Sequence, residues 1–133
     1  MRQKYRSVVI GCGNIGVLYE GDRGRLSPKS HAGALAADPR TELVAFVDSD
    51  AKKLEFAKKL FSSARTYRVA AECISRERPD IVVIAAPTRT HLPLAQLACR
   101  SKVKMLICEK PLSDTPKNAS KITRIAEDAG TVL

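Results

Sequence analysis

The sequence predicts an α/β fold in which a parallel β-sheet is covered by helices on both faces. Short apolar runs alternate with helical patterns along the whole chain. The apolar runs are continuous rather than interrupted by polar residues, as in strands that are buried on both faces. The first run is followed directly by a glycine-rich turn, and right-handed crossovers would connect successive strands.

Each element of this pattern has a local signal. Strands are expected over residues 7–11, 42–48, 65–67, 80–86 and 103–108, and residues 131–133 would begin a sixth. A helix is expected to begin at residue 17, and others to span 31–37, 51–61, 69–77, 91–101 and 116–129. The expected N-caps are Ser30, Ser49 or Asp50, Thr90 and Thr115, and Gly130 ends the last helix. The expected strand order is 3-2-1-4-5, with the sixth strand beyond the fifth.

Size and composition are those of one globular domain over residues 1–133. A hydrophobic fraction of 44% excludes a disordered chain. Because no apolar run approaches the ~20 residues that cross a membrane, and no signal peptide precedes the first strand, a cytoplasmic location is expected. The four cysteines lack the spacing of a metal or redox motif, so reduced and buried thiols are expected.

The net charge of +9 comes from Lys and Arg residues that are scattered along the chain. No block of five or six like charges occurs, and no aromatic residues alternate with basic ones. Nucleic-acid binding is therefore the least favoured interpretation, whereas a ligand that carries phosphates suits the basic balance.

The segment Gly11-Cys12-Gly13-Asn14-Ile15-Gly16 predicts a binding site for the phosphates of a dinucleotide. Gly11 permits a tight turn, Gly13 lets the backbone approach a pyrophosphate, and Gly16 lets the next helix pack closely on the strand. The helix start after the motif offers free N–H groups to the anion, and Asn14 and Ile15 within the motif are also expected to bind the cofactor. The motif follows a predicted strand and precedes a helical pattern, which is the context of the Rossmann fold.

Asp48, at the end of the second predicted strand, predicts a preference for NAD over NADP. A carboxylate there can accept hydrogen bonds from both hydroxyls of the adenine ribose, and it would repel a 2′-phosphate. The alternative is a simple helix cap. Asp48 follows Gly16 by 32 positions, whereas about 20 are usual. The polar loop of residues 20–30 accounts for the surplus.

Two further segments complete a resemblance to a known family. Ala86-Pro87-Thr88-Arg89-Thr90-His91 follows the fourth strand, and Glu109-Lys110-Pro111-Leu112-Ser113 follows the fifth. With the glycine turn and Asp48, they make the chain similar to the N-terminal half of the Gfo/Idh/MocA oxidoreductases. That family moves a hydride between NAD or NADP and a hydroxyl-bearing carbon, usually of a sugar or cyclitol.

The resemblance implies a role for each of these residues. Pro87 and Thr88 would line the nicotinamide side of the cofactor groove, and Thr88 replaces an Asn that many members have. His91 matches a common family histidine, although it could also be a helix-start residue without a ligand. Glu109 would bind the nicotinamide ribose. Lys110 would lie beside the nicotinamide and the substrate, as a cofactor-binding residue that also polarises the reacting oxygen or carries its proton. Its bond to Pro111 is often cis in the family.

The resemblance also implies a second domain, which covers the active site, binds the substrate and supplies an Asp and a His for proton transfer. The 133 residues contain no such domain, so turnover by this chain alone is not expected. A stand-alone NAD-binding sensor or subunit is the alternative. His31 is expected to anchor the polar loop rather than to act in catalysis. Because the sixth strand is only begun, the fifth is expected to be an exposed edge, and self-association into a homo-oligomer is expected.

Overall fold

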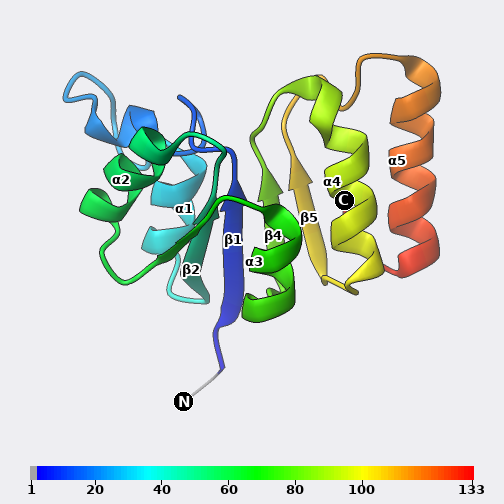
Figure 1. Ribbon diagram of the computed structural model, residues 1–133, viewed down its shortest axis with the longest axis horizontal. Coiled ribbons are helices and arrows are strands. Elements are labelled where there is room, and N and C mark those ends of the chain that lie inside the picture. The colour runs from blue at the N-terminus through cyan, green and yellow to red at the C-terminus, as the bar shows by residue number, and fades with distance from the viewer. Residues whose placement is uncertain (1–2) are drawn as a thin grey trace.

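Five parallel strands form a single sheet in the computed structural model of the protein, which describes residues 3–133 (Figure 1). The strands are β1 (Tyr5–Ile10), β2 (Thr41–Val47), β3 (Arg65–Tyr67), β4 (Ile81–Ile84) and β5 (Met105–Cys108). Their order is β3-β2-β1-β4-β5, which confirms the predicted doubly wound sheet. Successive strands run outward from β1 to β3, and the chain then returns to place β4 on the other side of β1. In doubly wound sheets the ligand crevice lies at this reversal of strand order, between the loops that follow β1 and β4.

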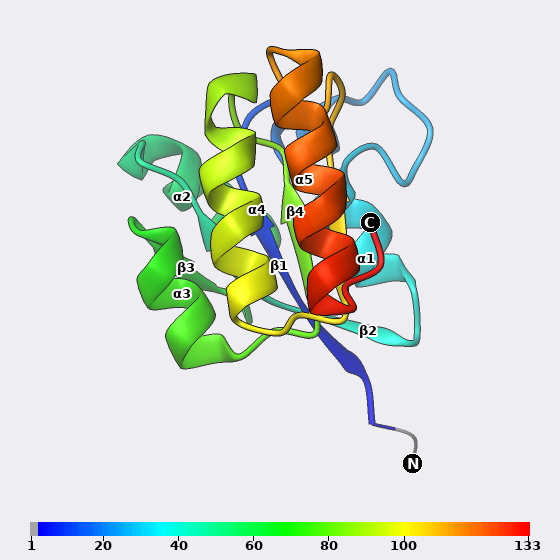
Figure 2. The same ribbon diagram turned by 90° about the vertical axis from the view of Figure 1, so that its right-hand side faces the viewer.

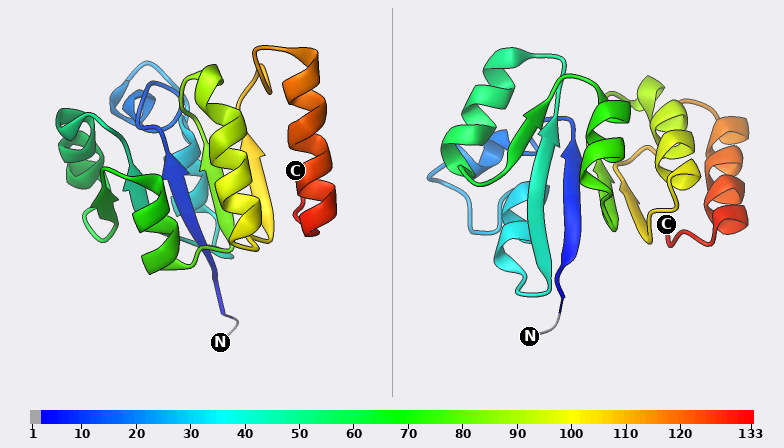
Figure 3. Two further views of the ribbon diagram at one scale, coloured as in Figure 1. Left: turned by 45° about the vertical axis from the view of Figure 1, so that its right-hand side comes forward. Right: turned by 60° about the horizontal axis from the view of Figure 1, so that its bottom comes forward.

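Helices cover both faces of the sheet (Figures 2 and 3). They are α1 (His31–Ala37), α2 (Ala51–Leu60), α3 (Ala70–Glu77), α4 (His91–Arg100) and α5 (Pro116–Ala129), with short 3-10 helices η1 (Leu18–Gly21) and η2 (Thr88–Thr90). On one face, α1 and α2 bury Leu35 and Leu54 against Phe46. On the other face, α3, α4 and α5 enclose a second core that includes Val82 and Ile122. No helix within residues 3–133 is long and apolar enough to cross a membrane.

Three local predictions are wrong. The helix expected to begin at residue 17 is only a turn followed by η1. Thr90 precedes α4 at the predicted N-cap position, but its side chain accepts no capping hydrogen bond, and its hydroxyl donates to the carbonyl of Pro87 (2.7 Å). The fourth and fifth strands are shorter than expected, because only β4 (Ile81–Ile84) and β5 (Met105–Cys108) are paired as strands. By contrast, Ser30 and Thr115 accept hydrogen bonds from Gly33 and Asn118 as the predicted N-caps.

The beginning of a sixth strand is present beside β5. Val132 forms a parallel bridge with Met105. The N–H of Leu106 donates to the carbonyl of Val132 (2.8 Å), and the N–H of Val132 donates to the carbonyl of Lys104 (3.0 Å). Within residues 3–133, this bridge is the only pairing on the outer edge of β5.

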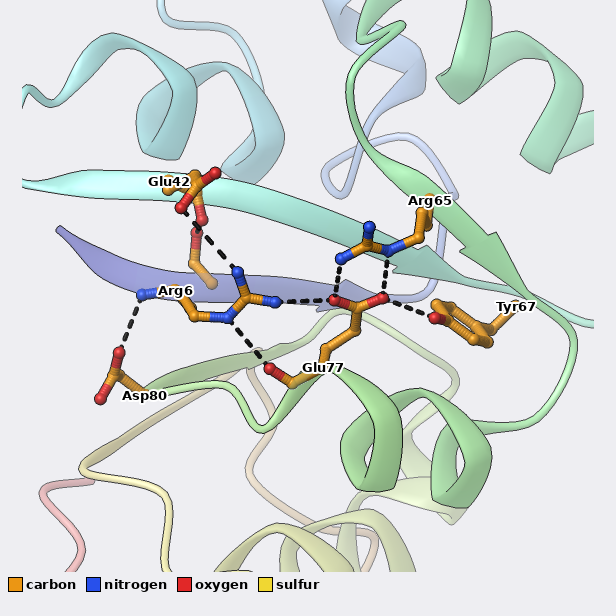
Figure 4. Close-up of polar contacts among 7 residues, drawn as sticks. Arg6, Glu42, Arg65, Tyr67, Glu77 and Asp80 are labelled. Atoms are coloured by element: carbon orange, nitrogen blue, oxygen red, sulfur yellow. Dashed lines mark hydrogen bonds and ion pairs between the residues drawn. The ribbon is translucent and has the colours of Figure 1, made fainter.

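A buried carboxylate joins α3 to the sheet (Figure 4). The side chain of Glu77 is only 2% exposed, and it accepts hydrogen bonds from Arg6 (2.8 Å), from two nitrogens of Arg65 (2.5 and 2.6 Å) and from the hydroxyl of Tyr67. The hydrogen bonds from the guanidinium of Arg65 lower the pKa of Glu77 most. Burial raises the pKa, and the hydroxyl of Tyr67 lowers it further. The net result is a pKa below the usual value of a glutamate. Two strands, β1 and β3, and one helix are therefore linked through one ionised group.

Candidate functional site

The loops that follow β1, β2, β4 and β5 begin at the same edge of the sheet (Figure 1). The strand ladder extends one residue into each of these loops, through backbone hydrogen bonds from Gly11 to Val47 (2.8 Å), Asp48 to Tyr67 (3.2 Å), Ala85 to Ile10 (2.8 Å) and Glu109 to Ile84 (2.9 Å). The first residue of each loop is thus paired by a backbone hydrogen bond, in the same way as the residues of the strand before it. The predicted site residues are carried by these four loops, at the carboxyl edge where parallel sheets bind ligands.

The three glycines of the turn have different surroundings. A Cβ atom on Gly11, whose φ is +98°, would lie 2.3 Å from the carbonyl oxygen of Ala85, and one on Gly16 would lie 2.1 Å from that of Gly11. Neither position can hold a side chain. A Cβ atom on Gly13 would meet nothing within 4 Å. The fold therefore requires Gly11 and Gly16, whereas the open side of Gly13 suits the close approach of a ligand.

Backbone donors are available at this turn. Within residues 3–133, the N–H groups of Gly13, Asn14 and Ile15 have no hydrogen-bond acceptor. The side chains of Asn14 and Ile15 are exposed. Successive free N–H groups at the start of a helix attract an anion such as a pyrophosphate.

Asp48 connects the turn to the end of β2. One carboxylate oxygen accepts a hydrogen bond from the N–H of Cys12 (2.8 Å), and the other accepts from the N–H of Asp50 (2.8 Å). An ionised carboxylate has about four acceptor positions, so two remain for the hydroxyls of a ribose. The Cys12 thiol is inert, because burial, reinforced by the charge of Asp48, raises its pKa to about 12.

The turn of residues 13–17 and α1 are separate pieces of chain that are hydrogen-bonded to each other in helical register. The N–H of Val17 donates to the carbonyl of Gly13. The N–H groups of His31 and Ala32 then donate to the carbonyls of Ile15 (2.9 Å) and Gly16 (3.0 Å). In a continuous helix these two carbonyls would pair with residues 19 and 20. Residues 18–29, which we call the excursion, are looped out between the two pieces.

The excursion explains the unusual spacing in the sequence. Without its twelve residues, Asp48 would follow Gly16 by 20 positions, the usual number. Its own contacts hold it against α1 and α2. The hydroxyl of Ser30 donates to the carboxylate of Glu20 (2.6 Å), and Gly21 lies against the ring of Phe56.

Glu109 and His31 form a pair at the far side of the crevice. The His31 Nε2 atom lies 2.7 Å from Glu109 Oε1, and the two side chains are 22% and 25% exposed. The backbone N–H of Lys110 donates to Glu109 Oε2 (3.3 Å). Lys110 itself is exposed, and its bond to Pro111 is cis, as the resemblance implies. The hydrogen bond from His31 is the main reason that the pKa of Glu109 lies below its usual value.

His91 is buried and connects two of the loops. Its Nε2 atom lies 2.9 Å from the carbonyl oxygen of Ala86, and its Nδ1 atom lies 3.2 Å from that of Leu112. Both ring nitrogens therefore have protein partners. Of the two interpretations left open by the sequence, this geometry favours a structural role over direct contact with a ligand.

Pro87 and Thr88 lie where the chain leaves β4 and enters η2. The Pro87 carbonyl accepts from the N–H (2.8 Å) and the hydroxyl of Thr90, while the Pro87 side chain is exposed. The sequence predicted His31 as an anchor of the polar loop but did not predict its contact with Glu109, which depends on the looped-out excursion.

Comparison with known proteins identifies the family. Residues 5–133 match the family described as an oxidoreductase family with an NAD-binding Rossmann fold, Gfo/Idh/MocA. The chain belongs to this family. It is 30% identical over 131 residues to a D-apiose dehydrogenase of Paraburkholderia graminis, covering 98% of this chain and 32% of the relative. It is 34% identical over 95 residues to an inositol 2-dehydrogenase of Rubrobacter xylanophilus, covering 71% and 27%.

Solved structures agree with this assignment. An oxidoreductase from Agrobacterium radiobacter, crystallised with NAD⁺, L-tartaric acid and magnesium, superposes with a TM-score of 0.82 at 25% identity, covering 97% of this chain and 34% of that one. The chain thus spans about a third of the length of the curated relatives that it matches. The Gfo/Idh/MocA domain described here binds NAD, and the open Gly13, the free N–H groups and Asp48 fit that cofactor.

Proposed function

We propose that this Gfo/Idh/MocA domain serves an oxidoreductase that transfers a hydride between NAD and a hydroxyl-bearing carbon of a sugar or cyclitol. The observation that supports it most is the Glu109-Lys110-Pro111 segment, held at the carboxyl edge of β5 across the crevice from the glycine turn. The relatives named above are dehydrogenases of D-apiose and inositol, which carry such carbons. The substrate would be held by a second domain, which the family places after the cofactor domain.

In the proposed reaction, NAD supplies the hydride acceptor. The N–H groups of the turn hold the pyrophosphate, and Asp48 accepts from the hydroxyls of the adenine ribose. Glu109 would accept a hydrogen bond from the nicotinamide ribose, next to Lys110 in the sequence. Lys110 would either donate to the reacting oxygen as an ammonium, which polarises it, or take up the proton of the substrate hydroxyl as a neutral amine. Its exposed position in this domain suits contact with a substrate that a second domain would place over the edge.

Replacement of Lys110 tests this role. We would assay the natural gene product that carries this chain for NAD-dependent oxidation of inositols, D-apiose and D-glucosides. The Lys110→Met substitution should lower kcat by about 100-fold or more, as expected for loss of an acid–base group, and leave NAD affinity unchanged. Arg89, an exposed cation on η2, provides the control substitution Arg89→Met, which should leave kcat unchanged. An unaltered kcat in the Lys110 variant would exclude the proposed role, and absence of turnover in the unmodified protein would favour the NAD-binding sensor or subunit.

We also propose that Asp48 makes the domain prefer NAD to NADP. Its carboxylate is held by Cys12 and Asp50 at the end of β2, and a 2′-phosphate placed there would be repelled. The ratio of the affinities for NAD and NADP measures this preference directly. Replacement of Asp48 by alanine should lower that ratio.

We propose, finally, that the domain self-associates through the edge of β5 and acts in the cytoplasm. The edge is bridged only by Val132 within residues 3–133, and Met105, Ile107 and Leu133 line a groove of about 370 Å³ beside it. The four cysteines are all unpaired thiols, which supports a reducing compartment. Light scattering over a range of concentrations tests the association, and a mass that stays monomeric at high concentration would exclude it.

A further inference from the structure

One contact at the carboxyl edge has no part in the function proposed above. His31 and Glu109 are 78 positions apart in the chain, yet their side chains meet at 2.7 Å. Each is about three-quarters buried, so the contact is largely protected from water. An ionised carboxylate can only accept, so the Nε2 atom of His31 donates to Glu109 Oε1.

The looped-out excursion is what brings His31 to this place. Its backbone N–H pairs with the carbonyl of Ile15, so His31 occupies the position that residue 19 would take in a continuous helix. Side chains on a helix lean toward its N-terminus, which here is the end of α1 nearest the glycine turn. The imidazole therefore projects toward the carboxyl edge of the sheet, where the end of β5 presents Glu109.

The bond from His31 restricts how Glu109 can turn. One oxygen, Oε1, is held by the imidazole, and the other, Oε2, receives only the long bond from the N–H of Lys110 (3.3 Å). The carboxylate plane is thus fixed, while Oε2 keeps acceptor capacity for a further donor. Among the described contacts of Glu109, the imidazole is the only side-chain donor.

We propose that His31 is a positioning residue, which holds the carboxylate of Glu109 in the orientation that accepts from the nicotinamide-side ribose. This inference rests on the proposed role of Glu109. The excursion matters for this role, because looping out residues 18–29 lets His31 pair with Ile15 in helical register. That register places the His31 side chain opposite the end of β5. His31 would touch neither the nicotinamide nor the substrate.

Ligands that differ by one ribose separate this role from a general structural one. We would titrate the chain with NAD, with ADP-ribose and with ADP, which lacks the second ribose. His31→Leu removes the donor at similar volume. It should weaken NAD and ADP-ribose by about tenfold, the factor expected for one hydrogen bond to a charged group, and leave ADP unchanged. His31→Gln retains an N–H donor and should recover most of the NAD affinity.

Two further variants complete the design. Leu26→Ser changes a side chain at the tip of the excursion that is 93% exposed, and it should leave all three affinities unchanged. In a Glu109→Ala background, which lacks the acceptor of the His31 N–H, His31→Leu should cause little additional loss, because the two side chains act through one contact.

The outcomes separate the positioning role of His31 from the proposed role of Glu109 in binding NAD. An equal loss of ADP affinity in His31→Leu, or an unchanged affinity for NAD, would overturn the positioning role while leaving the NAD site intact. An unchanged NAD affinity in Glu109→Ala alone, which leaves no acceptor for the ribose, would overturn the proposed role of Glu109 as well. Failure of the unmodified chain to bind any of the three ligands would overturn both.

Discussion

The carboxylate of Glu77 offers a test of how the sheet and α3 are held together. The substitution Glu77→Gln keeps the shape of the side chain and removes its charge. The Glu77 carboxylate accepts four hydrogen bonds, two at each oxygen. In the glutamine variant an amide nitrogen replaces one oxygen and cannot accept the two hydrogen bonds that this oxygen received. Each bond to a charged group contributes ~1.5–3 kcal/mol. Because the side chains of Arg6 and Arg65 are 33% and 61% exposed, water compensates part of the loss. We expect the free energy of unfolding to fall by about 2–3 kcal/mol.

The dependence on pH provides an independent check. The native-state pKa of Glu77 is depressed, so its ionised form stabilises the fold. That contribution is fully present above the ordinary pKa of 4.5, and it is lost as the pH falls through the depressed pKa. The difference in stability between the unmodified protein and Glu77→Gln should therefore be constant near neutrality and shrink in acid below about pH 4.5.

Urea unfolding followed by circular dichroism measures both effects. Glu42→Gln is the matched control, since Glu42 also faces Arg6 but at 4.0 Å and with 56% of its side chain exposed. That variant should lose less than about 0.5 kcal/mol. A loss for Glu77→Gln no larger than the control, or a difference that persists unchanged into acid, would refute the reasoning.

Three further predictions concern the carboxyl edge. Deleting residues 18–29 should leave the unfolding free energy within about 1 kcal/mol, because His31 already lies in helical register with Ile15; loss of cooperative unfolding in urea would contradict the two-piece helix. Gly13→Ala should fold normally, and calorimetry should show that it binds NAD at least about tenfold more weakly. Gly16→Ala should lose about 3 kcal/mol or more of unfolding free energy, because its Cβ would clash with the backbone carbonyl of Gly11. His91→Phe should lower the unfolding free energy by about 2 kcal/mol, because a part-buried carbonyl, of Ala86 or of Leu112, loses the imidazole N–H as its donor; a thermal midpoint equal to that of the unmodified protein would exclude this role.

Most of the fold could be predicted because the apolar runs and the caps are local signals. The strand at 65–67 and the helix at 31–37 are observed as expected, and both are bounded by polar or turn residues in the sequence. The strand order followed from the glycine turn, which places β1 in the middle of the sheet. Thr90 occupies the N-cap position of α4, but its backbone is helical instead of extended as in Ser30 and Thr115, so its hydroxyl does not accept from the first turn.

The candidate site was predicted less completely. The glycine turn of residues 11–16 and Asp48 could be predicted from the dinucleotide-binding motif. Glu109 and Lys110 could be predicted only from the resemblance to the family. The pairing of His31 with Glu109 could not be predicted, because it depends on hydrogen bonds that skip the excursion, and no local pattern shows which residues a helix loops out. The surplus of twelve positions between Gly16 and Asp48 was the available signal, although it does not by itself show where the helix resumes.

The most direct test of the central claim is a calorimetric titration of the chain with NAD and with NADP, repeated with Asp48→Ala. We predict that the unmodified chain binds NAD in a 1:1 ratio and at least about tenfold more tightly than NADP, and that the substitution removes most of this difference. Failure to bind NAD, a preference for NADP, or a ratio that is unchanged in Asp48→Ala would contradict the proposed arrangement of the site.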